Sequence, residues 1–222
     1  MAQQLSAHPL RFLIAEDHEA VVVGITPALQ ARYPAAELTI AKTVRAVEES
    51  IAEQLPDLII TDLTLPAEEQ TIPSIKAGLT LLQRLIDHEL APSLLVFSTH
   101  IRSLIRLKAS INTYRGGFVA RGKSTPIENI IEAVGIALKG SIDLPPDVRS
   151  RSEFDPRWLQ VLALKYEEGL SDKAIAQIMG VSDRTVRNYW TRIQDALGVF
   201  DSTQQDLKVQ IQIAAKKAGL IE

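Results

Sequence analysis

Short apolar runs alternate with amphipathic segments over the first 140 residues of the chain. The runs are nearly continuous in apolar side chains, which is typical of parallel strands covered on both faces. The pattern predicts strands at residues 10–15, 37–41, 58–61, 94–97 and 117–120. It predicts helices at residues 19–32, 44–54, 79–88, 102–110 and 126–139. Thr125, followed by Pro126 and Glu128, is the clearest predicted N-cap. Five strands alternating with five helices predict a doubly wound, five-stranded parallel α/β domain.

The hydrophobic pattern changes after residue 140. The stretch "GSIDLPPDVRSRSEFD" is rich in proline, serine and charge, and it is typical of a linker. Beyond it the pattern is purely helical, with helices predicted at residues 156–168, 172–179, 184–197 and 203–217. Ser171 and Ser182 stand where N-caps belong, and a glycine follows each segment. The predicted organisation is therefore an α/β domain at 1–140, a linker at 141–153 and an all-α domain at 154–222.

Composition excludes several kinds of site and gives no overall signature of nucleic-acid binding. The formal net charge is −3, and 46% of the 222 residues are hydrophobic, so the chain can form a core. The absence of cysteine excludes disulfides, cysteine zinc sites and cysteine nucleophiles. No apolar run approaches the roughly 18 residues that span a bilayer, and the start shows no signal-peptide pattern. We expect a cytoplasmic protein with no membrane partner.

Polar side chains follow several of the predicted strands. Glu16 and Asp17 follow the first strand, Asp62 the third, Ser98 the fourth and Arg121 the fifth. Because strand ends gather at one edge of a doubly wound sheet, these groups should lie together. Three carboxylates need a cation, and an all-oxygen cluster suits Mg²⁺. Beside a bound metal, Asp62 could attack a phosphoryl group; in isolation, the same residue could merely cap a turn.

These strand ends resemble those of response-regulator receiver domains. The matching words are "EDH", "TDLTLP", "VFST" and "GGFVAR", and the resemblance covers about residues 10–140. It implies a flavodoxin-like fold in which Asp62 accepts a phosphoryl group from a histidine kinase or a small donor. It also implies a set of site residues: Glu16, Asp17, Asp62 and the backbone carbonyl of Thr64 as metal ligands, with the Ser98 hydroxyl and the Phe118 ring as the switch.

Two features depart from the receiver pattern. The family usually has a lysine three residues after the switch aromatic, where this chain has Arg121, with Lys123 two residues further on. Either Arg121, which is bulkier and forked, replaces that lysine, or the backbone shifts so that Lys123 reaches the phosphate. The second feature is an insertion, "AEEQTIPSIKA" at residues 67–77, between Pro66 and Gly78. This loop could gate phosphorylation, bind a partner or be a tolerated surface insertion.

Residues 169–199, "GLSDKAIAQIMGVSDRTVRNYWTRIQDALGV", form a predicted helix-turn-helix. Apolar residues form the inner face of both helices, and polar side chains near the start of the second helix point outward. Arginine pairs bidentately with guanine and asparagine with adenine, so these side chains suit a DNA groove. The predicted DNA contacts are Arg187, Asn188 and Thr191 in the groove, and Lys173, Arg184 and Thr185 at phosphates. The alternative is an ordinary helical hairpin with solvated arginines.

The same segment resembles the LuxR-type DNA-binding domain of NarL/FixJ response regulators, through "GLSDKAIA", "VSDRTVRNY" and "ALGV". With the similar linker "GSIDLPPDV", the resemblance covers about residues 140–200. It implies binding to double-stranded promoter DNA and a homodimer interface on the last helix, which could equally pack only on its own domain. Tyr189 and Trp190 replace smaller or imidazole side chains, and Thr191 stands where the family often has lysine, so the base preference should differ.

The two resemblances together predict a DNA-binding transcription factor that is switched by Mg²⁺-dependent phosphorylation of Asp62. Its only expected chemistry is self-phosphorylation from a donor and slow dephosphorylation, so we do not expect an enzyme. As an alternative, a protein partner could regulate the receiver through Arg121, Lys123 and the loop at 67–77, without phosphorylation. A metal-dependent phosphohydrolase using Asp62 is a third hypothesis. The attached DNA-binding domain and the lack of an evident second general acid argue against it.

Overall fold

The computed structural model describes residues 9–149, 154–199 and 206–221. Its contacts divide the chain into two compact units. The first comprises Met1–Ile101 and Ala109–Pro146, and the second comprises Arg102–Lys108 and Asp147–Glu222. The predicted linker spans the division after Pro146, and its residues 150–153 lie outside the described residues. Among the described residues, every strand belongs to the first unit, and the second unit is helical.

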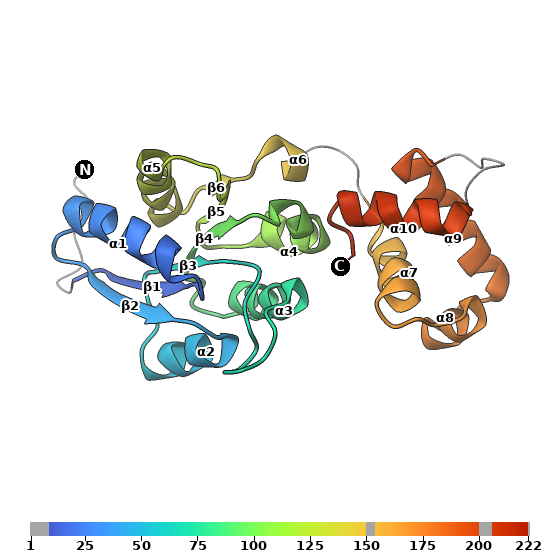
Figure 1. Ribbon diagram of the computed structural model, residues 1–222, viewed down its shortest axis with the longest axis horizontal. Helices are drawn as coiled ribbons and strands as arrows, with labels where there is room; N and C mark the ends of the chain where they lie inside the picture. Colours follow the sequence, from blue (N-terminus) through green and yellow to red (C-terminus); the bar gives the residue numbers. More distant parts are fainter. Residues whose placement is uncertain (1–8, 150–153, 200–205, 222) are drawn as a thin grey trace. The chain divides into compact units, whose positions relative to one another are not determined.

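The first unit is built on one parallel sheet with the strand order β2-β1-β3-β4-β5-β6 (Figure 1). Its strands are β1 (Arg11–Ala15), β2 (Glu37–Ala41), β3 (Leu58–Thr61), β4 (Ser93–Ser98), β5 (Phe118–Gly122) and β6 (Ile142–Asp143). The five predicted strands are confirmed to within two residues at each end. The sixth strand was not predicted, because its two residues lie in the polar, proline-rich linker.

Helices cover both faces of this sheet. They are α1 (Glu19–Arg32), α2 (Val44–Glu53), α3 (Ile75–Ile86), α4 (Lys108–Thr113) and α5 (Ile127–Leu138). Figure 1 shows α1 and α5 on one face and α2 and α3 on the other. On the α1/α5 face, strand residues such as Phe12, Ile60 and Val119 form one buried cluster with Ile25 and Ile130. This two-sided burial explains the nearly continuous apolar runs of the strands.

Three helix predictions were wrong in detail. Helix α3 begins at Ile75, four residues before the predicted start at residue 79, because the Ser74 hydroxyl caps it there. Residues 102–110 do not form one helix, because the 3₁₀ helix η1 (Ile101–Leu107) precedes the short α4. Helix α5 has Pro126 rather than Thr125 at its N-cap, with no capping hydrogen bond from a side chain. Pro126 has φ −57° and ψ 149°, so its ψ is extended and helical geometry begins only at Ile127.

After the four-residue α6 (Pro146–Arg149), the described residues of the second unit form four helices. They are α7 (Pro156–Tyr166), α8 (Asp172–Ile178), α9 (Asp183–Leu197) and α10 (Leu207–Lys217). The hydroxyls of Ser171 and Ser182 accept hydrogen bonds from backbone N–H groups three residues on, which confirms both predicted N-caps. Gly198 ends α9 with a left-handed φ of 63°. The predicted last helix began at residue 203, which lies outside the described residues.

None of the helices in the described parts of the chain is long and apolar enough to cross a bilayer.

Gly78, in α3, packs directly on the loop that follows Asp62. A Cβ built on Gly78 would lie 1.9 Å from the carbonyl oxygen of Leu63. Since that oxygen belongs to the backbone, Gly78→Ala should lower the free energy of unfolding by about 1–3 kcal/mol, as overpacking does. Gly24→Ala in α1 is the matched control, because its added Cβ meets no heavy atom within 4 Å. The control should stabilise by about 0.5–1 kcal/mol. Equal urea midpoints for the two variants would contradict this reading.

Candidate functional site

Glu16 and Asp62 lie side by side at the carboxyl edge of the sheet. Each follows directly after a strand, and the two strands, β1 and β3, are paired there through Ala15 and Thr61. Both side chains are buried, with 4% and 3% of their area exposed. Two neighbouring carboxylates at this depth repel each other and have lost hydration, so they require a cation.

Lys123 supplies that positive charge. Its Nζ lies 2.6 Å from Glu16 Oε2 and 2.7 Å from Asp62 Oδ2. Burial opposes the charge on Lys123, but hydrogen bonds and charge from Asp62 and Glu16 outweigh burial and raise its pKa above the ordinary 10.5. Arg121 instead pairs with Asp143 in β6, with Nη2 2.5 Å from Oδ2. Of the two cations that the sequence left open, Lys123 therefore lies in the acidic cluster.

His18 adds an imidazole to this cluster. The Nδ1 atom of His18 lies 3.0 Å from Glu16 Oε1 and 2.8 Å from Asp17 Oδ1. The His18 side chain is 63% exposed, so it stands at the solvent side of the two buried acids. The sequence motif "EDH" includes His18, but no role was predicted for this histidine. The signal was present, because His18 directly follows the two predicted metal ligands.

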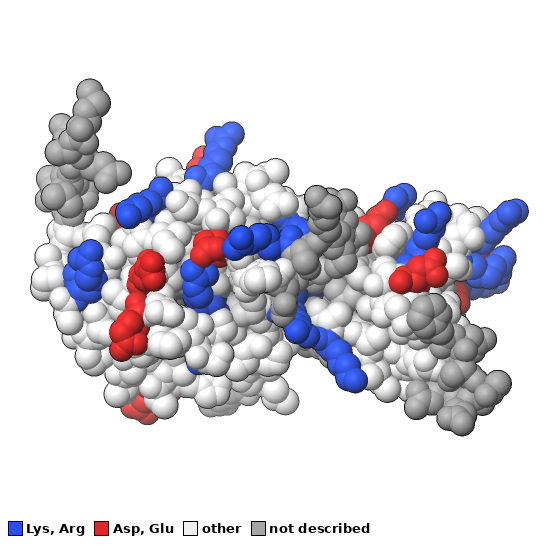
Figure 2. Space-filling view, turned by 90° about the horizontal axis from the view of Figure 1, so that it is seen from above, with Lys and Arg blue, Asp and Glu red and all other residues white. Residues whose placement is uncertain are grey.

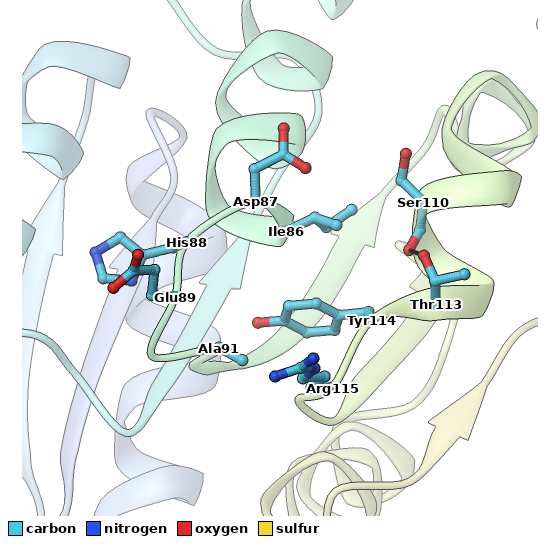
Figure 3. Close-up of a pocket in the computed structure, with 9 residues that line it drawn as sticks. All are labelled: Ile86, Asp87, His88, Glu89, Ala91, Ser110, Thr113, Tyr114 and Arg115. Carbon is cyan, nitrogen blue, oxygen red and sulfur yellow. Dashed lines mark hydrogen bonds between the residues drawn. The ribbon is translucent and has the colours of Figure 1, made fainter.

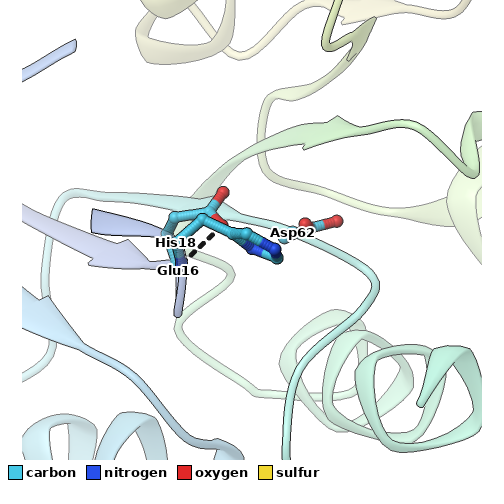
Figure 4. A group of neighbouring side chains, drawn as sticks. All are labelled: Glu16, His18 and Asp62. Atoms are coloured by element: carbon cyan, nitrogen blue, oxygen red, sulfur yellow. Dashed lines mark hydrogen bonds and ion pairs between the residues drawn. The ribbon is translucent and has the colours of Figure 1, made fainter. Parts of the chain in front are cut away.

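The acidic cluster has a donor set that fits a divalent cation. Glu16, His18 and Asp62 each offer a ligand atom, and these atoms lie within 4.8 Å of one another (Figure 4). The neighbouring Asp17 Oδ1 already lies 2.8 Å from His18 Nδ1, so Asp17 is a further carboxylate beside this group. Oxygen-rich sites of this kind suit Mg²⁺, which keeps several waters. Lys123 competes with any such ion for the same two carboxylates.

The loop after Asp62 is tied to the end of β4. The backbone N–H of Thr64 donates to Asp62 Oδ1 at 3.1 Å, and Thr64 Oγ1 lies 3.1 Å from His100 Nδ1. Ser98 is fully buried, and its hydroxyl accepts from the His100 N–H at 3.1 Å. Phe118, at the start of β5, is also fully buried. His100 thus connects the Ser98 end of β4 to Thr64, a contact that the sequence could not reveal.

The insertion at residues 67–77 protrudes beside this loop. An isolated antiparallel bridge joins Leu65 to Ser74, and Ser74 then caps α3 by accepting from the Ala77 N–H at 3.1 Å. Residues 67–73 are exposed, with Ile72 at 89%. A pocket of about 450 Å³ lies between the loop, α2 and α3, but its arginines are paired with glutamates. The bridge closes residues 66–73 into a loop, and the last three residues of the predicted insertion, 75–77, already belong to α3.

A second pocket, of about 280 Å³, lies at the opposite end of the sheet (Figure 3). Its lining residues precede β4 and β5 rather than follow them, and they include Ala91, Tyr114 and Arg115. The Tyr114 hydroxyl donates to the Pro92 carbonyl, and burial raises the pKa of Tyr114 well above its ordinary value. None of the predicted site residues lines this pocket. It is therefore separate from the acidic cluster.

In the second unit, α9 presents a polar face with helical spacing. The exposed residues of that face are Arg184, Arg187, Asn188 and Thr191. Val186 and Ile193 are buried on the other side of the helix. Lys173 is exposed on α8, whereas Thr185 is half-buried with its hydroxyl 2.9 Å from that of Ser182. Val186, Ile193 and the α8 residue Ile175 belong to one buried cluster, which fixes α9 against α8.

The positive charge on the exposed face of α9 comes from a few arginines. Within the part of the chain that the structure describes, Arg184 and Arg187 form no ion pair. Figure 2 shows basic and acidic side chains interspersed on the face in view, in keeping with a net charge of −3. Any attraction for a polyanion therefore has to come from a small group of side chains such as those on α8 and α9.

Comparison with known proteins finds a family model for part of the second unit and relatives that match most of the chain. Residues 156–193, which span α7, α8 and most of α9, match the family model described as Sigma-70, region 4. The transcriptional regulatory protein YdfI of Bacillus subtilis (strain 168) is 24% identical over 208 residues, 87% of this chain and 92% of its own length. The transcriptional regulatory protein LnrK of the same organism is 22% identical over 219 residues, 88% and 94% of the two lengths.

Solved structures of the response regulator RcsB share the fold. A complex of RcsB with DNA superposes with a TM-score of 0.57 at 20% identity, covering 94% of this chain and 98% of that one. RcsB of Salmonella typhimurium gives 0.55 at 20% identity, with 95% and 98% covered. The chain therefore shares the fold of the solved response regulator RcsB. The first unit carries the acidic cluster with Lys123, and the second unit carries the exposed face of α9.

Proposed function

We propose that this response regulator binds double-stranded promoter DNA and is switched by phosphorylation of Asp62. The observation that carries the proposal is the buried cluster of Glu16, Asp62 and Lys123 on the same chain as the arginine-bearing face of α9. The first is a site for phosphoryl chemistry, and the second is a surface for a nucleic acid. A regulator of this kind would work in the cytoplasm.

The proposed reaction uses Asp62 as the nucleophile. One carboxylate oxygen of Asp62 forms a bond to phosphorus as the bond from phosphorus to the donor breaks, and the donor is a histidine kinase or a small acyl phosphate. Glu16, Asp17, Asp62 and the Thr64 carbonyl would hold Mg²⁺, with His18 beside them. The bound ion would neutralise charge on the transferred oxygens. Lys123 already contacts Asp62 and would turn to those same oxygens.

The proposed switch runs through β4 and β5. Ser98 lies at the end of β4, and its hydroxyl now accepts a hydrogen bond from the His100 N–H. This hydroxyl would turn to the phosphoryl group on Asp62 and so give up its bond to His100. Phe118 is buried at the start of β5 and would repack as β4 and β5 adjust. A local charge thereby biases a two-state element that controls dimerisation and the helix-turn-helix domain.

On DNA, α9 would lie in the major groove. Arg187 and Asn188 are exposed near the start of the helix and suit guanine and adenine, with Thr191 one turn on. Arg184, Thr185 and Lys173 would contact phosphates and fix the register. A homodimer would read two half-sites about one helical turn, roughly 34–36 Å, apart.

Intact mass spectrometry tests the phosphorylation. Incubation with acetyl phosphate and Mg²⁺ should add one phosphoryl group to the wild type and none to Asp62→Asn. Asp57→Asn is the matched control, because Asp57 precedes β3 at its opposite end and accepts from the Arg11 N–H. That variant should be phosphorylated like the wild type. An adduct that persists in Asp62→Asn would contradict Asp62 as the acceptor.

A partner-controlled receiver is the second candidate. The observation that favours it is the exposed loop at residues 67–77, with Ile72 89% exposed beside the acceptor loop. If the wild type takes no phosphoryl group from acetyl phosphate or from a kinase-containing extract, phosphorylation control fails and this candidate replaces it.

A further inference from the structure

Two cations stand close together at the end of β5, and they have different partners. Lys123 is held by Glu16 and Asp62, whereas Arg121 is held by Asp143. Both side chains are largely buried, with 15% of Lys123 and 22% of Arg121 exposed. Arg121 is the fourth residue of β5, whereas Lys123 lies in the turn after the strand. The two side chains therefore leave different parts of the backbone.

The strand register places Arg121 level with Asp62. Thr61 pairs with Val96 and Val96 with Ala120, so the residues one position on, Asp62 and Arg121, fall in the same row. They are separated by two strand spacings, about 10 Å between backbones. Phe97 lies between the two in this row, so a long arginine side chain would have to turn over Phe97 to reach the acceptor carboxylate. Arg121 could therefore compete with Lys123 for contact with the Asp62 carboxylate.

Asp143 holds the Arg121 side chain at the far edge of the sheet. One Arg121 nitrogen, Nη2, lies 2.5 Å from Asp143 Oδ2, and the other, Nη1, donates to the Ala120 carbonyl at 2.9 Å. Asp143 is itself fixed, because β6 pairs with β5 through Val119 and the Phe118 N–H donates to the Ser141 carbonyl at 3.0 Å. A charge-assisted pair anchored in this way is among the stronger hydrogen-bonded contacts.

We propose that Asp143 is a positioning residue for the acceptor site: it holds the Arg121 guanidinium at the linker edge and thereby leaves Asp62 to Lys123. The inference deepens the proposed function and rests on it for its bearing on phosphorylation. Lysine is a compact charge that can move from the carboxylate to a phosphoryl group, whereas the bulkier, forked arginine would make the same move less well. The start of the linker thus takes part in setting the charge at the acceptor.

The reactivity of Lys123 tests the proposal without any phosphorylation. Full-length protein is treated with a limiting amine-acetylating reagent, and modification of Lys123 is followed by peptide mass spectrometry. Asp143→Asn should raise it severalfold, because Arg121 is freed to displace Lys123 from the carboxylates. Adding Arg121→Gln to Asp143→Asn should return it to the wild-type level. If Asp143 only stabilised the fold, both variants would be equally reactive, and the proposal would be overturned.

Glu37→Gln is the matched control for this experiment. Glu37 forms the corresponding strand-to-strand pair with Arg11, 3.0 Å apart, between β1 and β2. Its loss also frees an arginine, but at the amino-terminal end of the strands, where β1 and β2 begin and Arg11 pairs with Glu37. Lys123 reactivity should not change. A rise equal to that in Asp143→Asn would overturn the proposal, since the effect would not depend on the position of the freed cation.

Phosphorylation supplies a second measurement, made in the presence of Mg²⁺. Lys123→Gln should slow phosphoryl incorporation by about 10²-fold, as loss of a charge-stabilising donor does. Lys123→Gln with Asp143→Asn should recover to within about tenfold of the wild type, because the freed Arg121 takes the vacant place. No recovery, or full activity of Lys123→Gln alone, would overturn the inference while leaving the proposed function intact. An unphosphorylated wild type would overturn the proposed function alone, and the reactivity experiment would still decide the inference.

Discussion

Lys123→Met is expected to lower the free energy of unfolding of the receiver by about 3–5 kcal/mol at neutral pH, because it breaks a buried ion cluster on one side. Glu16 and Asp62 would stay buried without the cation that they share. Urea unfolding followed by far-ultraviolet circular dichroism measures the loss. Both tryptophans of the chain, Trp158 and Trp190, lie in the second unit, so tryptophan fluorescence is an internal control that should not shift.

Lys42→Met gives the matched surface comparison. Lys42 is exposed, and its replacement should change the free energy of unfolding by less than about 0.5 kcal/mol. Mg²⁺ should restore more stability to Lys123→Met than to the wild type, since the ion no longer competes with the lysine. A Lys123→Met protein as stable as the wild type would show that another group compensates the two acids.

The same cluster predicts how this stability difference depends on pH. The pKa of Lys123 is higher in the folded protein than its ordinary 10.5, so its stabilising contribution is complete below that value. The contribution is lost as the pH rises through the folded pKa. The gap between wild type and Lys123→Met should stay constant around neutral pH and narrow in alkaline solution. Urea unfolding curves measured across this pH range test the prediction. If the stability difference between the two proteins narrowed already near neutral pH, a group other than Lys123 would be responsible.

Arg187→Ala is expected to weaken binding to the preferred DNA site by about 1–3 kcal/mol and to relax the base preference at one position of each half-site. The reason is that Arg187 is exposed on the outer face of α9 and makes no ion pair with another described residue. Selection of binding sites from random DNA, followed by titration of matched and mismatched sites, measures both effects.

Lys173→Ala provides the contrast for this prediction. As a phosphate contact, its loss should weaken binding to all sequences alike and reduce the slope of log affinity against log salt by about 1. Lys216→Ala removes the same charge from an exposed position on α10 and should leave the slope unchanged. If Arg187→Ala behaved like Lys173→Ala, with no change in base preference, Arg187 would be a phosphate contact and α9 would be seated differently.

Periodicity and strand-end chemistry were sufficient to predict most of the fold. The core strands are buried on both faces, so their apolar runs were unambiguous, and β2 and β3 were placed to the residue. Helix starts with a serine cap were also found, as at Ser182, because the cap is a local interaction. The predicted cap at Thr125 was wrong because Pro126 has an extended ψ, so α5 begins at Ile127, one residue later than expected.

The cluster at the carboxyl edge of the sheet could be located from the sequence, but its full set of residues could not. The order of Glu16 and Asp62 after two strands predicted their proximity, since parallel strand ends meet. The choice between Arg121 and Lys123 could not be made, because it depends on Asp143, a residue in an unpredicted strand 22 positions from Arg121. The contact of His100 with Thr64 likewise joins residues 36 positions apart. Contacts of this kind follow from three-dimensional packing rather than from any local pattern.

The closed loop at residues 67–77 offers a place for an optical reporter. The natural chain has no cysteine, so a single Ile72→Cys substitution would create one site for a thiol-reactive fluorophore. Ile72 is 89% exposed, and the bridge between Leu65 and Ser74 holds the loop ends beside the acceptor without involving the tip. A dye at this position, ten residues along the chain from Asp62, would report on changes in the loop that follows Asp62. The state of the receiver could then be followed in real time, without antibodies or radioactivity.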